Sequence, residues 1–557
     1  MNGKLIRFLN NQESLVLVCF VVVSFLIGLT SLHFFHFVGS DGGGDGVGYA
    51  LVGKNLFSGE GLSLRGGPEL IHPPFYPILI GLFWFFTHNL EYSGQMVSII
   101  ATTLLVIPIY YLTKQMYGRK VALVCAGFTI VFPPLVYGST EIRCEPLYTL
   151  LLISSVALSW QTLRSTNIFW AFLTGLMIGL AYLTHSMGII FIPIFIVFLL
   201  LSRFLVSRPT KKRILAKIVL LLVSFIIVSL PYWFFLHRHT GKWLISGNTA
   251  YIQFSEAHLS GGNLERDSFI FSEEPSWVKY KNSRFSQSGG GMIGFAISHP
   301  GKLFRVVIKN FLSIYPKIVE NTERLRVSSS IVKTSLLFIL SVILAGLFKS
   351  IWDRRFTGKE FYLMVILLSA SVFLFFHIEP RYFFPYLPIL ILGLAKVTVE
   401  IESWLSRKFS HSNRIFSPLG GFIIPGILIL GMSIPSAHLI LKKKSIVPYE
   451  YKIMGQWMKE NIEDVSDNLV MSRKAGVPFY AGSKWNPLYY GEYAELIKYA
   501  RSKRIDYLVI DEYTISRLRP RLTFLLDSSK DHPGLEVVHV TQYRGRKIIL
   551  YCFSRSY

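Results

Sequence analysis

The chain is dominated by apolar stretches that are each about as long as a membrane-spanning helix. A helix needs about 20 mostly apolar residues to cross a bilayer, and fewer where aromatic or charged side chains anchor its ends. About eleven stretches meet this criterion, at residues 15–36, 95–113, 120–138, 146–163, 168–183, 187–204, 214–236, 331–349, 361–377, 383–402 and 415–438. Only 16% of the 557 residues are charged and 51% are hydrophobic, which is too apolar for an ordinary soluble enzyme. We therefore predict a polytopic α-helical membrane protein.

The lysines and arginines of the short connections indicate the orientation. Short loops rich in Lys and Arg stay on the cytoplasmic side of a membrane. If the N-terminus is cytoplasmic, every short basic connection falls on that side, from Lys4 and Arg7 near the start to Arg407, Lys408 and Arg414 near the last predicted span. The first apolar stretch is too long for the core of a signal peptide. We therefore expect a retained anchor in the inner (plasma) membrane.

Residues 74–88 decide the number of spans. They are apolar, but they form a short stretch that begins at a double proline and lacks flanking cations. We interpret them as a helix in the outer interface, since counting them as a span would reverse the orientation of everything that follows. Two short helices, Val47–Phe57 and Pro74–Phe86, are then expected within a first external loop at residues 37–94.

Two further segments are expected on the outer side. A second external loop spans residues 237–330 and ends in an amphipathic stretch, Lys302–Tyr315, which suits a membrane surface. Residues 445–557 follow a membrane domain at 1–444 and predict a small extracytoplasmic α/β domain. Its expected helices are Tyr451–Asn461 and Glu492–Ser502, and its expected strands are Tyr507–Ile510, Val537–Val540 and Lys547–Cys552.

The net charge and the cysteines exclude some classes of partner. The formal charge is +24, but the cations lie mostly beside apolar runs, so lipid headgroups and lipid-linked phosphates are better partners for them than nucleic acid. The four cysteines are far apart and lack metal-ligand spacing. We therefore expect neither a disulfide framework nor a zinc site.

Ionisable residues of mixed type gather at the predicted outer ends of the spans. Polar groups near a bilayer are costly, which makes them functional candidates. The inner ends carry almost only Lys and Arg, whereas the outer ends carry Asp41, Asp45, Glu141, Arg143, Glu145, Thr184, His185, Ser186, His237, Arg238, His239, His377, Glu379 and Arg381. Acids, histidines and arginines together on one face suit a catalytic site, whereas a face of cations alone is explained by the orientation of the chain in the membrane.

Each candidate also has a structural interpretation. Asp45 suits the N-cap of a helix, and Glu145 suits the helix start just before Pro146. Arg143 and Arg381 could extend toward lipid headgroups. The histidines could be ordinary loop residues, and the Gly42–Gly44 run reads as a turn. The presence of all these residues on one face favours a functional site more than any single residue does.

The order of these motifs resembles the GT-C glycosyltransferase superfamily, and in particular its family 39 type, which includes protein mannosyltransferases and the lipid A aminoarabinose transferase. The resemblance covers nearly the whole chain, including YLVID at Tyr507–Asp511. It rests on Asp45 with Tyr49, on HPPFYPILIGLFW at His72–Trp84, on Glu145-Pro146-Leu147-Tyr148, on Pro231-Tyr232-Trp233 with Thr240-Gly241, and on Glu379, Arg381 and Tyr382. The chain departs from the family at Thr184-His185-Ser186, where Thr-Arg-Pro is common.

The resemblance implies a GT-C fold and transfer of a sugar from a polyprenyl-phosphate donor to a lipid, glycan or protein acceptor at the outer face, with inversion. Such a hexosyl- or pentosyltransferase would use Asp45 as general base, with Glu145 positioning the acceptor or binding a metal. The donor phosphate would be bound by Arg381, Arg143, His185 and His72. Positioning of the acceptor or the loops would involve Tyr49, Asp41, Glu141, Glu379, Tyr382 and His237. A divalent cation, Mg²⁺ or Mn²⁺, stays open.

A transporter or a lipid flippase for a glycolipid is the alternative from another functional class. Transporters place ionisable residues near the membrane midplane, in helices broken by Gly or Pro. Here the acids fall at span ends and in loops, which favours the enzyme. An O-antigen ligase or polymerase would share the donor, but the early Asp loop and the Pro-Pro pair argue against it. The C-terminal domain could recognise the acceptor or bind a partner.

Overall fold

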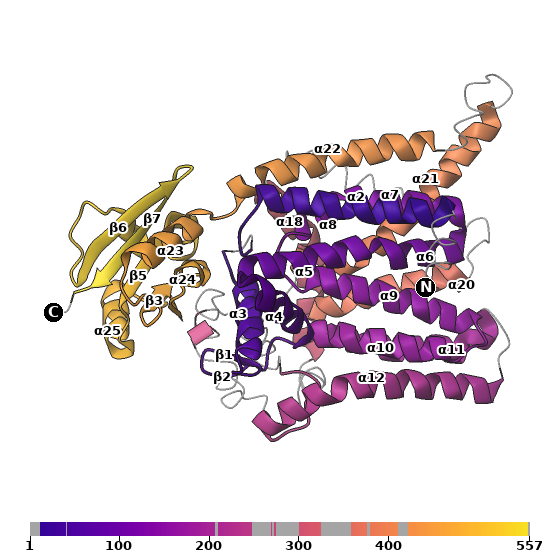
Figure 1. Cartoon of the computed structure of the whole chain (residues 1–557), viewed down its shortest axis with the longest axis horizontal. Coiled ribbons are helices and arrows are strands. Elements are labelled where there is room, and N and C mark those ends of the chain that lie inside the picture. The colour runs from indigo at the N-terminus through magenta and orange to yellow at the C-terminus, as the bar shows by residue number, and fades with distance from the viewer. Residues whose placement is uncertain are drawn as a thin grey trace.

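The computed structural model describes residues 12–39, 42–205, 210–247, 269, 272–273, 300–324, 358–375, 379–409 and 422–554. Most of the chain forms a body of helices that run side by side, with a small sheet domain at one end (Figure 1). The helices of the body are α2 (Gln12–Phe34), α5 (Leu90–Leu104), α6 (Val106–Tyr117), α7 (Arg119–Val131), α8 (Pro133–Gly138), α9 (Glu145–Arg164), α10 (Phe169–Thr184), α11 (Phe191–Leu205), α12 (Lys211–Thr240), α18 (Pro300–Arg324), α20 (Gly358–Leu368), α21 (Leu387–Phe409) and α22 (Ile423–Ile446).

The outer helices of this body present apolar side chains where a soluble protein would present polar ones. On α22, for example, Leu430 and Ile434 keep 69% and 73% of their surface exposed. Large exposed apolar surfaces of this kind require a non-aqueous neighbour. Within the described residues, seven helices are long and apolar enough to cross a membrane. The chain is therefore a multi-pass membrane protein, as its sequence predicts.

The predicted spans coincide with apolar helices wherever the structure describes them. Span 331–349 lies outside the described residues, so the total of about eleven stays a prediction. Several of the spans are short or broken. Phe132, in an extended conformation, separates α7 from α8, which begins with Pro133 and Pro134. The fifth and sixth spans correspond to the 16-residue α10 and the 15-residue α11, with a 3₁₀ turn, η1 (Ser186–Ile190), between them.

The loop predicted to be external, at residues 37–94, folds across the end of the body that faces the sheet domain (Figure 1). It contains α3 (Asp45–Phe57), the short hairpin of β1 (Ser63–Leu64) and β2 (Gly67–Pro68), and α4 (Phe75–Thr87). Helices α3 and α4 match the two short helices expected there. They pack closely because Gly53 and Gly81 meet at their contact, where a Cβ on Gly81 would come within 2.4 Å of the Gly53 carbonyl oxygen.

The amphipathic stretch predicted at 302–315 lies within α18. Val306 is buried, whereas Phe304, Phe311 and Leu312 are exposed. The Asn310 amide donates a hydrogen bond to the Leu374 carbonyl, 2.8 Å away, in the 3₁₀ segment η2 (Ser369–Phe375). The helix is thereby attached to the body while its apolar face stays outward, as expected for a helix at a membrane surface.

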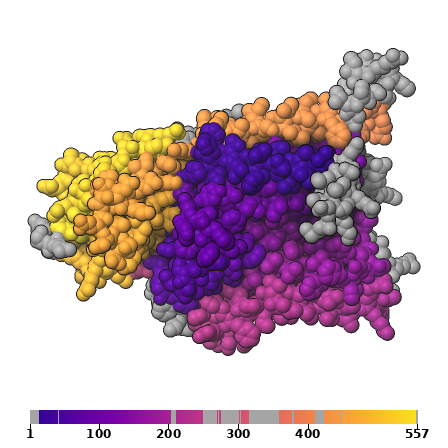
Figure 2. Space-filling model, viewed as in Figure 1, coloured from indigo at the N-terminus to yellow at the C-terminus, as the bar shows by residue number. Residues whose placement is uncertain are grey.

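The C-terminal domain is built on a five-stranded sheet with the order β4-β3-β5-β7-β6. Strands β3 (Leu469–Ser472), β4 (Lys484–Pro487) and β5 (Tyr507–Asp511) are parallel, and the hairpin of β6 (Leu535–Tyr543) and β7 (Arg546–Phe553) pairs with β5 in antiparallel fashion. The helical elements are α23 (Glu450–Asn461), α24 (Gly476–Ala481), α25 (Tyr493–Lys503), α26 (Glu512–Leu518) and the 3₁₀ segment η5 (Pro520–Leu526). Figure 2 shows this domain, in orange and yellow, seated on the end of the helical body. The predicted α/β domain is therefore present.

Candidate functional site

Arg381 brings together three of the carboxylates predicted from the sequence. Its Nη1 lies 2.6 Å from Asp45 Oδ2, and its Nε lies 2.5 Å from Glu379 Oε2 and 3.7 Å from Glu145 Oε1. These residues come from α3, from α9 and from the 3₁₀ segment η3 (Pro380–Tyr386) with the residue before it. Segments hundreds of residues apart therefore meet at the end of the body that carries α3 and the C-terminal domain (Figure 1).

Asp45 is the first residue of α3, not its N-cap. Gly44 occupies the cap position without a side-chain hydrogen bond, so the N-cap interpretation of Asp45 is wrong. The carboxylate accepts a hydrogen bond from Arg381 Nη1 at 2.6 Å. Glu145 likewise is the first residue of α9 and lies directly before Pro146, whose missing N–H costs nothing in a first helical turn.

Arg381 determines the electrostatics of Asp45. Burial alone would raise the pKa of this carboxyl, but the charge of Arg381, together with His72 and Arg143, holds the pKa well below its usual range. The Asp45 side chain still keeps 47% of its surface exposed, whereas Arg381 keeps 21%. Asp45 is therefore ionised at neutral pH and accessible to a bound molecule.

His72 and Tyr49 form one wall beside Asp45. The two rings meet edge to face with centroids 4.6 Å apart, and the Tyr49 hydroxyl donates to Cys144 Sγ at 3.2 Å. His72 Nδ1 lies 3.3 Å from Glu69 Oε1. Glu69 is almost fully buried and also accepts the backbone N–H groups of Ile71 and His72. Burial opposes the charge of Glu69, yet these hydrogen bonds lower its pKa, so the group that orients His72 is an anion.

Arg143 and Glu141 form a second charged set on the loop before α9. Arg143 Nε lies 2.9 Å from Glu141 Oε2, and the other Glu141 oxygen lies 3.9 Å from Lys443 Nζ. Lys443 is fully buried and donates to the Tyr137 carbonyl and the Thr140 hydroxyl at 2.5 and 2.8 Å. Glu141 is thereby held in the loop, and Arg143 lies close enough to influence Asp45.

His185 lies in the break between α10 and η1. Its ring packs on Tyr148 with centroids 5.2 Å apart, and its Nδ1 accepts the Met187 N–H. Burial first, and then the charge of Arg381, lower its pKa to about 4, with Asp45 opposing. His185 is thus a neutral group at physiological pH and close enough to Arg381 to sense its charge.

The remaining predicted residues are more scattered. Tyr382 lies under the Arg381 guanidinium, 5.7 Å from it, and stacks on Phe373. His237 stacks on Trp243 instead of joining the acids, with centroids 4.3 Å apart. Asp41 and His377 lie outside the described residues.

The described residues of the site do not have the geometry of a metal centre. In the part of the chain that the structure describes, no group of three or more His, Cys, Asp or Glu side chains is placed to hold a metal ion. Asp45, Glu145 and Glu379 each face the Arg381 guanidinium, so their charge is directed at a cation already present. These residues as arranged do not fit a divalent ion.

Sequence reasoning missed Glu69 and Lys443. Glu69 stands three residues before His72 in a loop, a spacing too common to attract attention. Lys443 reads as part of a basic flank after the last span, and nothing in the sequence distinguishes it from Lys442 or Lys444. The burial that makes it significant appears only in the folded chain.

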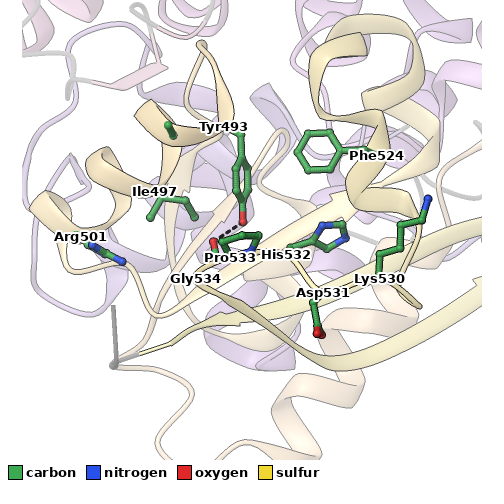
Figure 3. A pocket seen from close by; sticks show the side chains of 10 residues that line it. Tyr493, Ile497, Arg501, Phe524, Lys530, Asp531, His532, Pro533 and Gly534 are labelled. Carbon is green, nitrogen blue, oxygen red and sulfur yellow. Dashed lines mark hydrogen bonds between the residues drawn. The ribbon is translucent and has the colours of Figure 1, made fainter.

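A cavity of about 610 Å³ lies elsewhere, in the C-terminal domain (Figure 3). Residues of α25 and of the segment before β6 line it, and the Tyr493 hydroxyl donates to the Pro533 carbonyl at 2.8 Å. None of the site residues predicted from the sequence belongs to this lining. The cavity is therefore distinct from the cluster around Arg381.

Known proteins share this architecture. A family model described as dolichyl-phosphate-mannose-protein mannosyltransferase matches residues 71–233. The oligosaccharyltransferase of Archaeoglobus fulgidus in the apo form superposes with a TM-score of 0.57 at 14% identity, covering 90% of this chain and 70% of that one. ArnT from Cupriavidus metallidurans, bound to undecaprenyl phosphate, superposes with a TM-score of 0.56 at 13% identity, covering 96% and 97%.

A third structure is that of the A. fulgidus oligosaccharyltransferase AglB with an inhibitory peptide and a dolichol-phosphate, with a TM-score of 0.57 at 14% identity, covering 98% of this chain and 75% of that one. No curated protein sequence matches the chain. The family match begins one residue before His72 and includes Glu145 and His185. The chain therefore shares the fold of these membrane proteins, in agreement with the GT-C resemblance predicted from its sequence.

Proposed function

We propose that this protein transfers a sugar from a polyprenyl-phosphate donor to an acceptor hydroxyl at the extracytoplasmic face of the inner (plasma) membrane, with inversion at the anomeric carbon. The observation that carries the proposal is the ion pair between Asp45 and Arg381, which places a carboxylate and a guanidinium within 2.6 Å of each other. Solved relatives of the same fold bind undecaprenyl phosphate and a dolichol-phosphate, which supports a lipid-phosphate donor.

In this mechanism Arg381 binds the phosphate of the donor. A planar guanidinium donates two parallel hydrogen bonds to phosphate oxygens and is always charged. As the bond between the anomeric carbon and the phosphate oxygen breaks, negative charge grows on the leaving phosphate. A fixed cation stabilises that transition state more than the ground state. Arg143 and His72, both of which help to lower the pKa of Asp45, would add to the field at the phosphate, and the neutral His185 would contribute as a hydrogen-bond donor.

Asp45 acts as the general base. An acceptor hydroxyl is a weak nucleophile, so its proton must leave as its oxygen bonds to the anomeric carbon. In the resting protein the charge of Arg381 keeps Asp45 ionised but weakly basic. When the donor phosphate draws Arg381 toward itself, that constraint relaxes and the proton affinity of Asp45 rises. Binding of the donor phosphate therefore prepares the base for proton transfer.

The other predicted residues take supporting roles in this scheme. Glu145 and Glu379 flank Arg381 and would position the acceptor or orient the guanidinium. Tyr49, Glu141 and Tyr382 shape the loops around them. Asp41 and His237 keep their expected positioning roles as proposals. We also propose the division of the chain into a membrane domain at 1–444 and an extracytoplasmic domain at 445–557, with the N-terminus cytoplasmic.

The experiment uses the full-length protein in lipid nanodiscs with a panel of synthetic undecaprenyl-phosphate sugars, namely mannose, glucose and 4-amino-4-deoxyarabinose. Release of undecaprenyl phosphate is measured with and without a membrane extract as acceptor, and NMR of the product assigns its anomer. Asp45→Asn should abolish release while leaving the melting temperature unchanged. Asp467→Asn, at a carboxylate whose side chain is 83% exposed on the C-terminal domain, is the matched control. Unchanged turnover in Asp45→Asn would refute the base assignment.

A further inference from the structure

The segment that leads from α2 to Asp45 is built into the core of the C-terminal domain. Phe35 and Phe37 are fully buried in one apolar cluster with Tyr451, Met454 and other side chains of that domain. The Phe37 ring also stacks on Tyr480 of α24, with centroids 5.8 Å apart. The segment that leads to Asp45 is therefore held by the C-terminal domain and not by the helical body alone.

One residue of this segment, Val38, connects the C-terminal domain to Gly46, the residue after Asp45. The buried Val38 N–H donates to the Tyr480 hydroxyl at 2.7 Å. The carbonyl of Val38 lies against Gly46, where an added Cβ would meet it at 2.7 Å and would meet the Ile142 carbonyl at 2.8 Å. Tyr480 thus holds the N–H of Val38, and the carbonyl of Val38 packs against the first turn of α3.

Gly42, just before α3, is in close backbone contact with Gly476 of the C-terminal domain. An added Cβ on Gly476, the first residue of α24, would lie 2.5 Å from the Gly42 carbonyl oxygen. Gly42 has a φ of +82°, and a Cβ there would lie 2.7 Å from the Tyr451 ring. The loop therefore rests directly on the backbone of the C-terminal domain. Because α3 begins three residues after Gly42, a displacement of this contact would move Asp45.

An ion pair also links the C-terminal domain to the helical body. Lys452 of α23 lies 2.8 Å from Glu91 of α5 and donates to the His36 carbonyl at 3.1 Å. The Gln95 amide, also on α5, donates to the carbonyls of Phe35 and Phe37, both at 3.3 Å. The loop is thus clamped between the membrane body and the sheet domain.

We propose that the C-terminal domain is a positioning element of the transferase site: through Tyr480 and Gly476 it sets where the Asp45 carboxylate stands relative to Arg381. The proposal rests on the proposed role of Asp45 and assigns to the domain a task in transfer itself, separate from any recognition of acceptors. Tyr480 and Gly476 act through Val38 and Gly42 and are positioning residues.

The first test variant is Tyr480→Phe, which keeps the ring stacked on Phe37 and removes the hydroxyl that accepts the Val38 N–H and also hydrogen-bonds Glu91. A buried N–H without its acceptor favours a shifted loop. The matched control is Tyr551→Phe, because Tyr551 is a fully buried tyrosine of the same domain and its hydroxyl donates to the Leu525 carbonyl at 2.6 Å, in a separate core cluster. Any effect of removing a buried tyrosine hydroxyl from this domain appears in both variants.

The second variant is Gly476→Ala. The φ of Gly476 is not positive, so alanine is compatible with its backbone, and alanine is the better helix former for α24. Its methyl group would nevertheless push the Gly42 carbonyl. Gly431→Ala is the control, because an added Cβ at Gly431 of α22 would meet nothing within 4 Å.

Two readouts are taken on the full chain in nanodiscs. Amide hydrogen exchange of peptides covering residues 42–53 should be faster in Tyr480→Phe and Gly476→Ala than in their controls. With the undecaprenyl-phosphate sugars, kcat should fall about tenfold, as expected for loss of one buried hydrogen bond. The Kd for undecaprenyl phosphate alone should weaken less than twofold. The acid limb of the pH profile should move up, because Asp45 then lies farther from Arg381, His72 and Arg143.

The outcomes separate the two proposals. Exchange at residues 42–53 that matches the controls would overturn the positioning role, whatever the donor sugar is. Turnover equal to the controls would overturn it as well, provided that Asp45→Asn is inactive. If Asp45→Asn keeps full turnover, the proposed role of Asp45 as general base fails on its own, and hydrogen exchange still decides whether the C-terminal domain holds the loop.

Discussion

Replacing Arg381 by lysine tests the site while conserving its charge. The guanidinium reaches Asp45 with Nη1 at 2.6 Å and Glu379 with Nε at 2.5 Å. A lysine ammonium is a single nitrogen and cannot keep both geometries or donate two parallel hydrogen bonds to a phosphate. Losing one hydrogen bond to a charged group costs about 1.5–3 kcal/mol, and such a loss in the transition state slows the reaction roughly 10- to 150-fold.

The partial exposure of the pair decides where in this range the effect falls. Asp45 keeps 47% of its side-chain surface, so water screens part of the interaction. We therefore expect kcat/KM to fall by about 30-fold, the middle of the range set by that hydrogen bond.

The assay is the initial rate of undecaprenyl phosphate release at several donor concentrations. Arg521→Lys is the control, because Arg521 pairs with Glu492 on the surface of the C-terminal domain and its side chain is 72% exposed. Both variants should unfold at the wild-type temperature. A kcat/KM for Arg381→Lys within twofold of wild type would refute the reasoning that a bidentate cation binds the donor phosphate at this position.

Three further outcomes are expected. Because Arg381 lowers the pKa of Asp45, this carboxyl stays ionised until the pH falls well below its usual pKa, so the acid limb of kcat/KM lies at low pH. The acid limb of kcat should lie at higher pH, since the bound phosphate draws Arg381 away from Asp45. Acid limbs of kcat and kcat/KM at the same pH would contradict this. Lys443→Met should lower stability by about 3–5 kcal/mol, measured by denaturant unfolding against Lys442→Met. EDTA should leave the initial rate within about twofold of the untreated rate, because Asp45 and its neighbouring acids face Arg381 and not a metal-binding point.

The helical spans could be predicted because the bilayer imposes their length and apolarity residue by residue. The breaks inside them were harder to place. Pro133 and Pro134 end α7 inside a stretch that reads as one apolar span. In the C-terminal domain, β5, β6 and β7 have recognisable strand composition, but β3 and β4 have only four residues each, too few to show a period.

The site was predictable as a set of residue types on one face, but its pairing was not. Asp45 and Arg381 are 336 positions apart, and no local pattern says that they share a hydrogen bond. Asp45 was equally compatible with a helix cap, and only the position of Gly44 excludes that interpretation. Long-range contacts such as Val38 with Tyr480 depend on how two domains meet, which residue spacing does not encode.

The most direct test of the account is an experimental structure of the protein with undecaprenyl phosphate bound. We predict that a phosphate oxygen lies about 2.7–2.9 Å from the Arg381 guanidinium, at charge-assisted hydrogen-bond distance, with the Asp45 carboxylate turned toward the space for the acceptor. A phosphate bound at the opposite end of the helices, or one that leaves the ion pair of Arg381 with Asp45 unchanged, would contradict the account.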